Sequence, residues 1–157
     1  MAAQAHNHQH CIRNALASAE RVCAERGARL TPLRKRVLEL IWESHEAIKA
    51  YDLLDRLGDE GGSAKPPTVY RALEFLLAQG LIHRIESENA YVGCRHPERT
   101  HEFQLLICDD CRHVEEISVA GVTRALGEQA LKQGFRVSSQ TVEVHGQCPD
   151  CRSASGS

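Results

Sequence analysis

Residues 108–111 read Cys-Asp-Asp-Cys, and residues 148–151 read Cys-Pro-Asp-Cys. Each of these Cys-x-x-Cys pairs can present two sulfur atoms on one tight turn, and four thiolates together complete a tetrahedron around a zinc ion at about 2.3 Å per bond. The pattern therefore predicts a structural zinc site at Cys108, Cys111, Cys148 and Cys151. Such a site requires residues 112–147 to fold back on themselves as a small subdomain.

Disulfides and unrelated thiols are the other interpretations of these cysteines. A redox Cys-x-x-Cys motif is expected within a βαβ unit, whereas here two pairs occur together near the C-terminus. Residues 1–14 are polar and rich in histidine, without the apolar centre of a secretory signal. We therefore expect a cytoplasmic protein. That compartment is reducing, which favours metal thiolates over disulfides.

The composition is that of a soluble globular protein, with 42% hydrophobic and 25% charged residues. No stretch approaches the roughly 18 consecutive apolar residues of a membrane span. The formal net charge is −2, but its distribution is uneven: residues 1–85 carry 12 Lys and Arg against 10 Asp and Glu, and residues 86–157 carry 7 against 11. This asymmetry favours an N-terminal part that alone faces an anion.

Helical periodicity predicts four helices in the first half. The first ends at Gly27, and the second begins at Thr31-Pro32, which supplies an N-cap and a first-position proline. A short third helix is expected over residues 51–57, ended by a Gly-rich turn at 58–63. A fourth is expected from Pro66 to near Gly80.

After Gly80 the apolar period changes from helical to two, and residues 81–85 and 90–94 flank turn residues, which predicts a β-hairpin. Helices followed by a hairpin have the order of a winged helix. The second half reads as strands at 103–107 and 113–117, a helix over about 119–133 and a strand at 135–144.

The predicted fold class is therefore α+β, with an N-terminal winged helix-turn-helix domain and a small C-terminal α/β domain. We place the winged helix at residues 1–94, a hinge at 95–102, the zinc-stapled domain at 103–151 and a disordered tail at 152–157.

The third and fourth helices together suggest a helix-turn-helix, although their connection is longer than the usual turn. The first turn of the fourth helix carries Lys65, Thr68, Tyr70 and Arg71. Arg71 could pair with a guanine edge, while Thr68 and Lys65 suit phosphate. The alternative is a helix N-terminus whose polar residues simply stay hydrated.

Several of these segments together resemble the ferric-uptake-regulator (Fur) family of metal-dependent repressors: residues 31–34, 65–73, 107–111 and 148–151. Within that family, residues 50–54, Pro66-Pro67 and 143–146 are most similar to the zinc-uptake-regulator branch. The resemblance implies a homodimer whose winged helices bind a palindromic operator and whose C-terminal halves dimerise. It also implies Tyr51 and Arg71 as candidate base readers.

The resemblance further implies a second, regulatory metal site with the ligands His83, Cys94, His101 and Glu116. One thiolate, two imidazoles and one carboxylate form a tetrahedral set that suits zinc better than iron. Two ligands belong to the DNA-binding half and two to the other half, so the metal is expected to set the angle between them. Taken singly, each residue is equally compatible with packing or surface.

The sequence thus predicts a cytoplasmic, dimeric repressor of zinc-uptake genes that binds two zinc ions per subunit and double-stranded DNA, with no enzymatic activity, membrane segment or small-molecule substrate. An iron or peroxide sensor on the same scaffold is the first alternative, although only His101 stands where those sensors carry a His-x-His cluster. A zinc hydrolase or a pure interaction module are alternatives of other classes. Metal binding stays open for His6, His8, His10, His113 and His145, as do the roles of Cys11 and Cys23.

Overall fold

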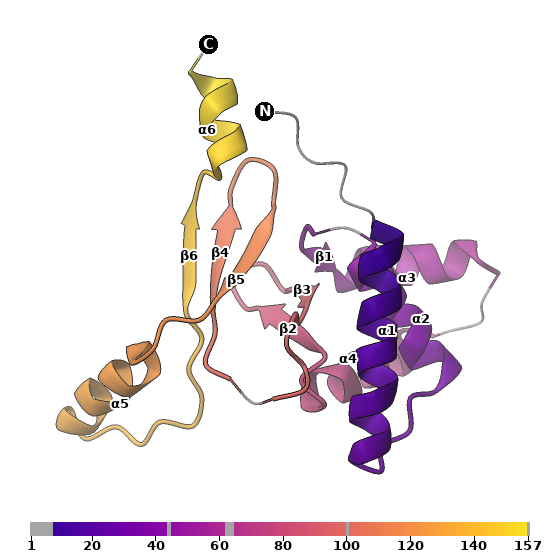
Figure 1. Ribbon diagram of the computed structural model, residues 1–157, viewed down its shortest axis with the longest axis horizontal. Helices are drawn as coiled ribbons and strands as arrows, with labels where there is room; N and C mark the ends of the chain where they lie inside the picture. The colour runs from indigo at the N-terminus through magenta and orange to yellow at the C-terminus, as the bar shows by residue number, and fades with distance from the viewer. Residues whose placement is uncertain (1–7, 44, 62–64, 100, 157) are drawn as a thin grey trace. The chain divides into compact units, whose positions relative to one another are not determined.

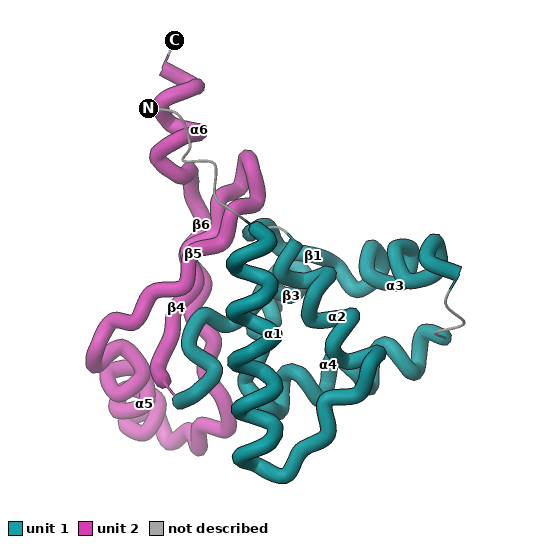
Figure 2. The backbone as a smooth tube through the Cα atoms, turned by 45° about the vertical axis from the view of Figure 1, so that its right-hand side comes forward, with its two compact units in different colours: residues 1–99 teal, residues 100–157 magenta. Residues whose placement is uncertain are grey.

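The computed structural model describes residues 8–43, 45–61, 65–99 and 101–156, and the chain divides into two compact units, residues 1–99 and 100–157 (Figure 2). The division lies inside 95–102, the predicted hinge, whose function as a hinge stays a prediction. Among the helices of these described stretches, none has both the length and the apolar character needed to traverse a lipid bilayer.

Four helices build most of the first unit (Figure 1): α1 (His8–Glu25), α2 (Pro32–Trp42), α3 (Ala50–Asp59) and α4 (Pro66–Ala78). The predicted start of α2 is confirmed, because Thr31 Oγ1 accepts a hydrogen bond from the Arg34 N–H at 3.4 Å. Gly27 follows α1 with φ +65°, a conformation that favours glycine.

Helix α3 is longer than predicted. The expected turn at 58–63 is wrong for residues 58 and 59, which continue the helix, and the Glu60 N–H still reaches Arg56 O at 3.3 Å. The left-handed conformation comes only at Gly61, with φ +72°. Glycine lowers helix stability without forbidding the helix, so Gly58 did not end it.

The predicted hairpin is confirmed as β2 (Ile82–Ile85) and β3 (Ala90–Gly93), which pair antiparallel. A strand that the sequence did not reveal, β1 (Ile48–Lys49), pairs with the other edge of β3, so the sheet order is β1-β3-β2. The helices and this sheet share one core, whose largest fully buried side chains include Leu38, Ile41, Leu53, Leu73 and Leu76.

The second unit contains β4 (Gln104–Cys108), β5 (Val114–Ile117), α5 (Val122–Lys132), β6 (Glu143–Gly146) and α6 (Pro149–Ser155). Its sheet order is β5-β4-β6, with β4 antiparallel to β5 and parallel to β6. A parallel pair needs a long crossover connection, which α5 and its flanking loops provide here. This topology brings Cys108, at the end of β4, beside Gly146, at the end of β6.

Two expectations for this unit are wrong. The predicted strand 135–144 is confined to Glu143–Gly146, because only these residues pair with β4, from Leu105↔Glu143 to Cys108↔Gly146. The predicted disordered tail is wrong for residues 152–155, which belong to α6; position 157 lies outside the described residues. Pro149 opens this helix, and the hydroxyls of Ser153 and Ser155 donate to carbonyls four residues earlier, each at 2.9 Å.

Candidate metal centres and nucleic-acid interface

The structure brings the four predicted zinc cysteines together in the second unit. Cys108 ends β4 and Cys111 follows in the turn to β5, while Cys148 caps α6 and Cys151 lies within it. The parallel pairing of β4 with β6 places the two Cys-x-x-Cys segments, here called the knuckles, next to each other. The Asp109 N–H donates to Gly146 O at 2.8 Å. All four sulfur atoms lie within 4.8 Å of one another.

The spacing of these sulfur atoms fits a tetrahedral metal. Cys111 Sγ and Cys148 Sγ are 3.7 Å apart, far beyond the roughly 2 Å of a disulfide bond. A tetrahedron of four thiolates with bonds of about 2.3 Å to zinc has sulfur–sulfur edges of about 3.8 Å. The observed separation therefore matches a shared ion and excludes a disulfide between this pair.

The thiols of this cluster do not ionise alike. Backbone N–H groups of Cys111 and Cys148 lower the pKa of Cys108 to about 6, and the Cys148 amide nitrogen lies 3.3 Å from Cys108 Sγ. Hydrogen bonding to the thiols of Cys148 and Cys111 raises the pKa of Cys151 instead. Amide N–H groups thus stabilise the Cys108 thiolate, whereas the neighbouring sulfur atoms disfavour ionisation of Cys151 unless a cation offsets their charge. A dication suits this arrangement.

His83 and Cys94 lie close together in the first unit. His83 is in β2 opposite Val92, and Cys94 follows β3, where its N–H donates to Leu81 O at 3.0 Å. The exposed fractions are only 7% for His83 and 3% for Cys94, and their candidate ligand atoms lie within 4.8 Å of each other. A buried imidazole beside a buried thiol is half of the predicted regulatory site.

His101 and Glu116 form a close pair in the second unit. His101 Nε2 lies 2.5 Å from Glu116 Oε1, and the side chains are only 13% and 8% exposed. Glu116 comes from β5, opposite Leu105 of β4. The second pair of predicted regulatory ligands is therefore also brought together within one unit.

The predicted DNA contacts lie on the solvent side of the first unit. Tyr51, in the first turn of α3, is 70% exposed, and Tyr70 of α4 is 43% exposed. The side chains of Lys65, Thr68 and Arg71 are also exposed. Residues between them on α4, Val69 and Leu73 among them, turn into the core, so packing anchors the helix while its polar face stays open.

The basic run 34–36 is mostly engaged within its own unit. Arg34 donates to Arg29 O at 2.5 Å and lies 3.8 Å over the Phe75 ring. Lys35 pairs with Glu20 at 2.5 Å, and Arg36 binds Glu39 and Glu60. Over the described ranges, by contrast, Lys65 and Arg71 are exposed and carry no ion pair.

His145 and Cys23, whose roles the sequence left open, are engaged in a charge contact and in core packing respectively. His145 directs one ring nitrogen at Asp109, 3.1 Å away, and the other at Glu143, 3.4 Å away, and Asp109 raises the pKa of His145. A ring held between two carboxylates favours an imidazolium over a metal ligand. Cys23 is buried in α1, and burial raises the pKa of its thiol. His6 lies outside the described residues.

Comparisons with known proteins agree with this arrangement. The model of the "Ferric uptake regulator family" matches residues 25–145. The chain is 47% identical to the zinc uptake regulation protein of Escherichia coli (strain K12) over 137 residues, covering 87% of this chain and 80% of that protein. It is 32% identical to the protein of the same name from Mycobacterium tuberculosis (strain H37Rv) over 130 residues, covering 81% and 97%.

A solved structure, described as a zinc uptake regulator complexed with zinc and DNA, is similar over most of its length. It aligns with a TM-score of 0.87 at 44% identity, covering 93% of this chain and 98% of that one. The similarity thus extends over both units.

Proposed function

The chain belongs to the ferric uptake regulator family, and on that basis we propose that it is a zinc-responsive transcriptional repressor, which binds operator DNA as a zinc-loaded dimer and represses zinc-uptake genes. One observation carries the proposal: a buried His83–Cys94 pair lies in the unit that holds the DNA-facing helix α4, and a His101–Glu116 pair lies in the other unit. The names of the similar proteins support zinc as the sensed metal.

We assign a structural zinc ion to Cys108, Cys111, Cys148 and Cys151. The 3.7 Å sulfur separation and the amide-stabilised Cys108 thiolate support this assignment. When bound, the metal supplies the positive charge that four neighbouring thiolates require. These residues in turn clamp the end of β4 to the start of α6, so the site stabilises the second unit rather than sensing zinc.

We assign a regulatory zinc ion to His83, Cys94, His101 and Glu116, which makes two zinc ions per subunit. A set with one thiolate donates less charge than four thiolates, so this site should release its metal more readily. Because two ligands come from each unit, occupation favours one arrangement of the units over the others. A ligand that prefers one arrangement in this way is the basis of allosteric control.

For DNA we assign Tyr51 and Arg71 as base readers, and Lys65, Thr68 and Tyr70 as further contacts. Their common exposure on α3 and α4 supports this assignment. A palindromic operator would follow from a symmetric dimer, in which each recognition helix meets one half-site.

The second unit is the proposed dimerisation domain, because it exposes apolar side chains on several elements. Leu106 of β4 and Val144 of β6 are 37% and 51% exposed, and Leu126 and Leu131 of α5 are 49% and 74% exposed. Helix α5 has no buried residue within the chain. Large apolar side chains in such numbers indicate a protein interface.

We propose a regulator and not an enzyme, acting in the cytoplasm where the operator DNA is. Each candidate metal site offers four protein ligands, whereas a catalytic zinc usually keeps three and leaves a position for water. Full ligation favours structural and sensory roles over hydrolysis.

The test is operator binding measured against buffered free zinc. A fluorescent palindromic operator of the family type is titrated with the purified dimer at a series of free zinc concentrations, with a scrambled duplex as control. We expect affinity for the palindrome to rise with zinc while the scrambled duplex binds weakly throughout. Equal binding with and without zinc would refute the proposal, and a response to Fe²⁺ but not to Zn²⁺ would support the iron sensor instead.

A further inference from the structure

Trp42, the last residue of α2, lies directly on Gly93, the last residue of β3. A Cβ atom built on Gly93 would come within 2.2 Å of Trp42 Cε2, 2.4 Å of Nε1 and 2.6 Å of Cζ2. Distances under about 3 Å are not tolerated between such atoms. Glycine is therefore required at this position by the indole, since Gly93 is not among the glycines with positive φ.

This contact is adjacent to the first-unit pair of candidate zinc ligands. Gly93 immediately precedes Cys94 and pairs with Ile82, the neighbour of His83. The Cys94 N–H is in turn held by Leu81 O. The indole thus contacts the last residue of β3, directly before Cys94. The strand partner of that residue, Ile82, is directly before His83.

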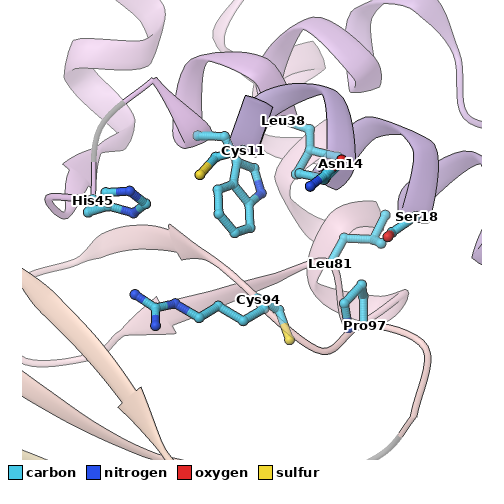
Figure 3. Close-up of a pocket in the computed structure, with 11 residues that line it drawn as sticks. Cys11, Asn14, Ser18, Leu38, His45, Leu81, Cys94 and Pro97 are labelled. Carbon is cyan, nitrogen blue, oxygen red and sulfur yellow. The ribbon is translucent and has the colours of Figure 1, made fainter. Parts of the chain in front are cut away.

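Trp42 also borders a pocket of the first unit. Trp42 and Cys94 both line a pocket of about 330 Å³ (Figure 3), together with Cys11, His45 and Leu81. The Trp42 and His45 rings meet edge to face, with centroids 6.4 Å apart. Trp42 therefore contacts the strand at Gly93 and borders the same pocket as Cys94.

We propose that Trp42 is a positioning residue for Cys94: through its contact with Gly93 it holds the thiol-bearing end of β3 in place and so sets the zinc affinity of the regulatory site. This inference rests on the proposed function, because it assumes that Cys94 ligates the sensed zinc. Residues that orient metal ligands typically change metal affinity about 10–100-fold when they are replaced. Trp42 acts here by shape, without touching the metal.

The test is a double-mutant cycle with Gly93→Ala and Trp42→Ala. Zinc affinity is measured by competition with chelators of graded strength, on dimers that keep their structural zinc. Gly93→Ala should weaken the regulatory site about tenfold or more, because the methyl group and the indole cannot occupy the same space. Trp42→Ala should also weaken it, because the strand loses its support. In the Trp42→Ala background, Gly93→Ala should add no further loss.

Gly58→Ala is the control, because Gly58, a residue of α3, likewise has no positive φ, and nothing lies within 4 Å of a Cβ atom built there. It should leave zinc affinity unchanged. Equal effects of Gly93→Ala in the Trp42 and Trp42→Ala backgrounds would overturn the proposal, as would unchanged affinity in Trp42→Ala. If Gly93→Ala does not fold, Trp42→Phe decides: weaker zinc binding with the structural zinc retained supports the inference, and wild-type affinity overturns it.

Failure of this inference and failure of the proposed function give different results. A wild-type dimer without a second zinc that chelators can remove would refute the regulatory site itself. If the wild-type dimer binds this zinc and responds to it, and the Trp42 and Gly93 variants have the same zinc affinity as the wild type, only the role of Trp42 is refuted. Trp42 is the single tryptophan of the chain, so its emission gives an independent measurement, and we expect it to change when the regulatory site fills.

Discussion

Cys111 Sγ and Cys148 Sγ lie 3.7 Å apart although 37 positions separate the two residues along the chain. Parallel pairing of β4 with β6 produces this proximity, because it places Cys108 beside Gly146 and so aligns the two knuckles. The cluster closes the connection that contains α5, and a metal held there would link the turn between β4 and β5 to α6.

Replacing Cys111 by serine should remove the structural zinc and unfold the second unit. The free energy of zinc binding at a structural thiolate site is comparable with the whole stability of a small domain. Zinc content by mass spectrometry and dimer content by sedimentation provide the measurement. Cys11→Ser, a change at a half-buried thiol of α1, is the control and should keep both. A folded Cys111→Ser dimer with undiminished zinc would rule out the assignment.

Replacing Cys94 by serine should leave a folded dimer that no longer responds to zinc. A neutral hydroxyl is a much poorer zinc ligand than a thiolate but has nearly the same volume, so the buried site loses metal rather than packing. We expect zinc affinity to fall by more than the roughly tenfold cost of losing an outer-shell partner. Operator affinity across buffered zinc is the measurement, and identical curves for variant and wild type would exclude Cys94 from the sensor.

Arg71→Ala and Lys65→Ala should affect DNA binding differently. If Arg71 reads a guanine, its loss costs about 1–3 kcal/mol and relaxes preference at one position of each half-site. Lys65→Ala should weaken all sequences alike and reduce the salt dependence, as expected for a phosphate contact. Binding to operator variants at several salt concentrations separates the two. Equal losses on operator and random DNA for Arg71→Ala would show that Arg71 contacts only the backbone.

Val144→Asp should impair dimerisation. Val144 is half exposed on β6, and an unpaired carboxylate buried in an apolar interface costs about 3 kcal/mol or more, equivalent to about a hundredfold in the dissociation constant. Sedimentation equilibrium measures the change. Ala17→Asp adds the same charge to an exposed position of α1 and should leave the dimer intact. An unaffected Val144→Asp dimer would place the interface elsewhere.

Local patterns predicted much of the fold because they act over a few residues. The Thr31 cap and Pro32 define the start of α2, and the apolar period of two on either side of a turn defines the hairpin β2–β3. Elements that have no local sequence signal were not predicted. β1 is only Ile48–Lys49, and it is a strand because Tyr91 and Ala90 of β3 pair with it. A long strand was expected over 135–144, but only the four residues Glu143–Gly146 pair with β4.

The sequence by itself determined the candidate chemistry: the two Cys-x-x-Cys pairs, and the residue types of the proposed regulatory ligands, follow from spacing, ligand preference and family resemblance. Only the tertiary structure decided which groups pack beside those residues. Trp42 and Gly93 lie far apart in the chain, and neither carries a metal-binding atom, so no motif connects them. Their contact arises because α2 packs on β3. Packing of this kind depends on many side chains that are distant in the sequence, so no short stretch of sequence encodes it.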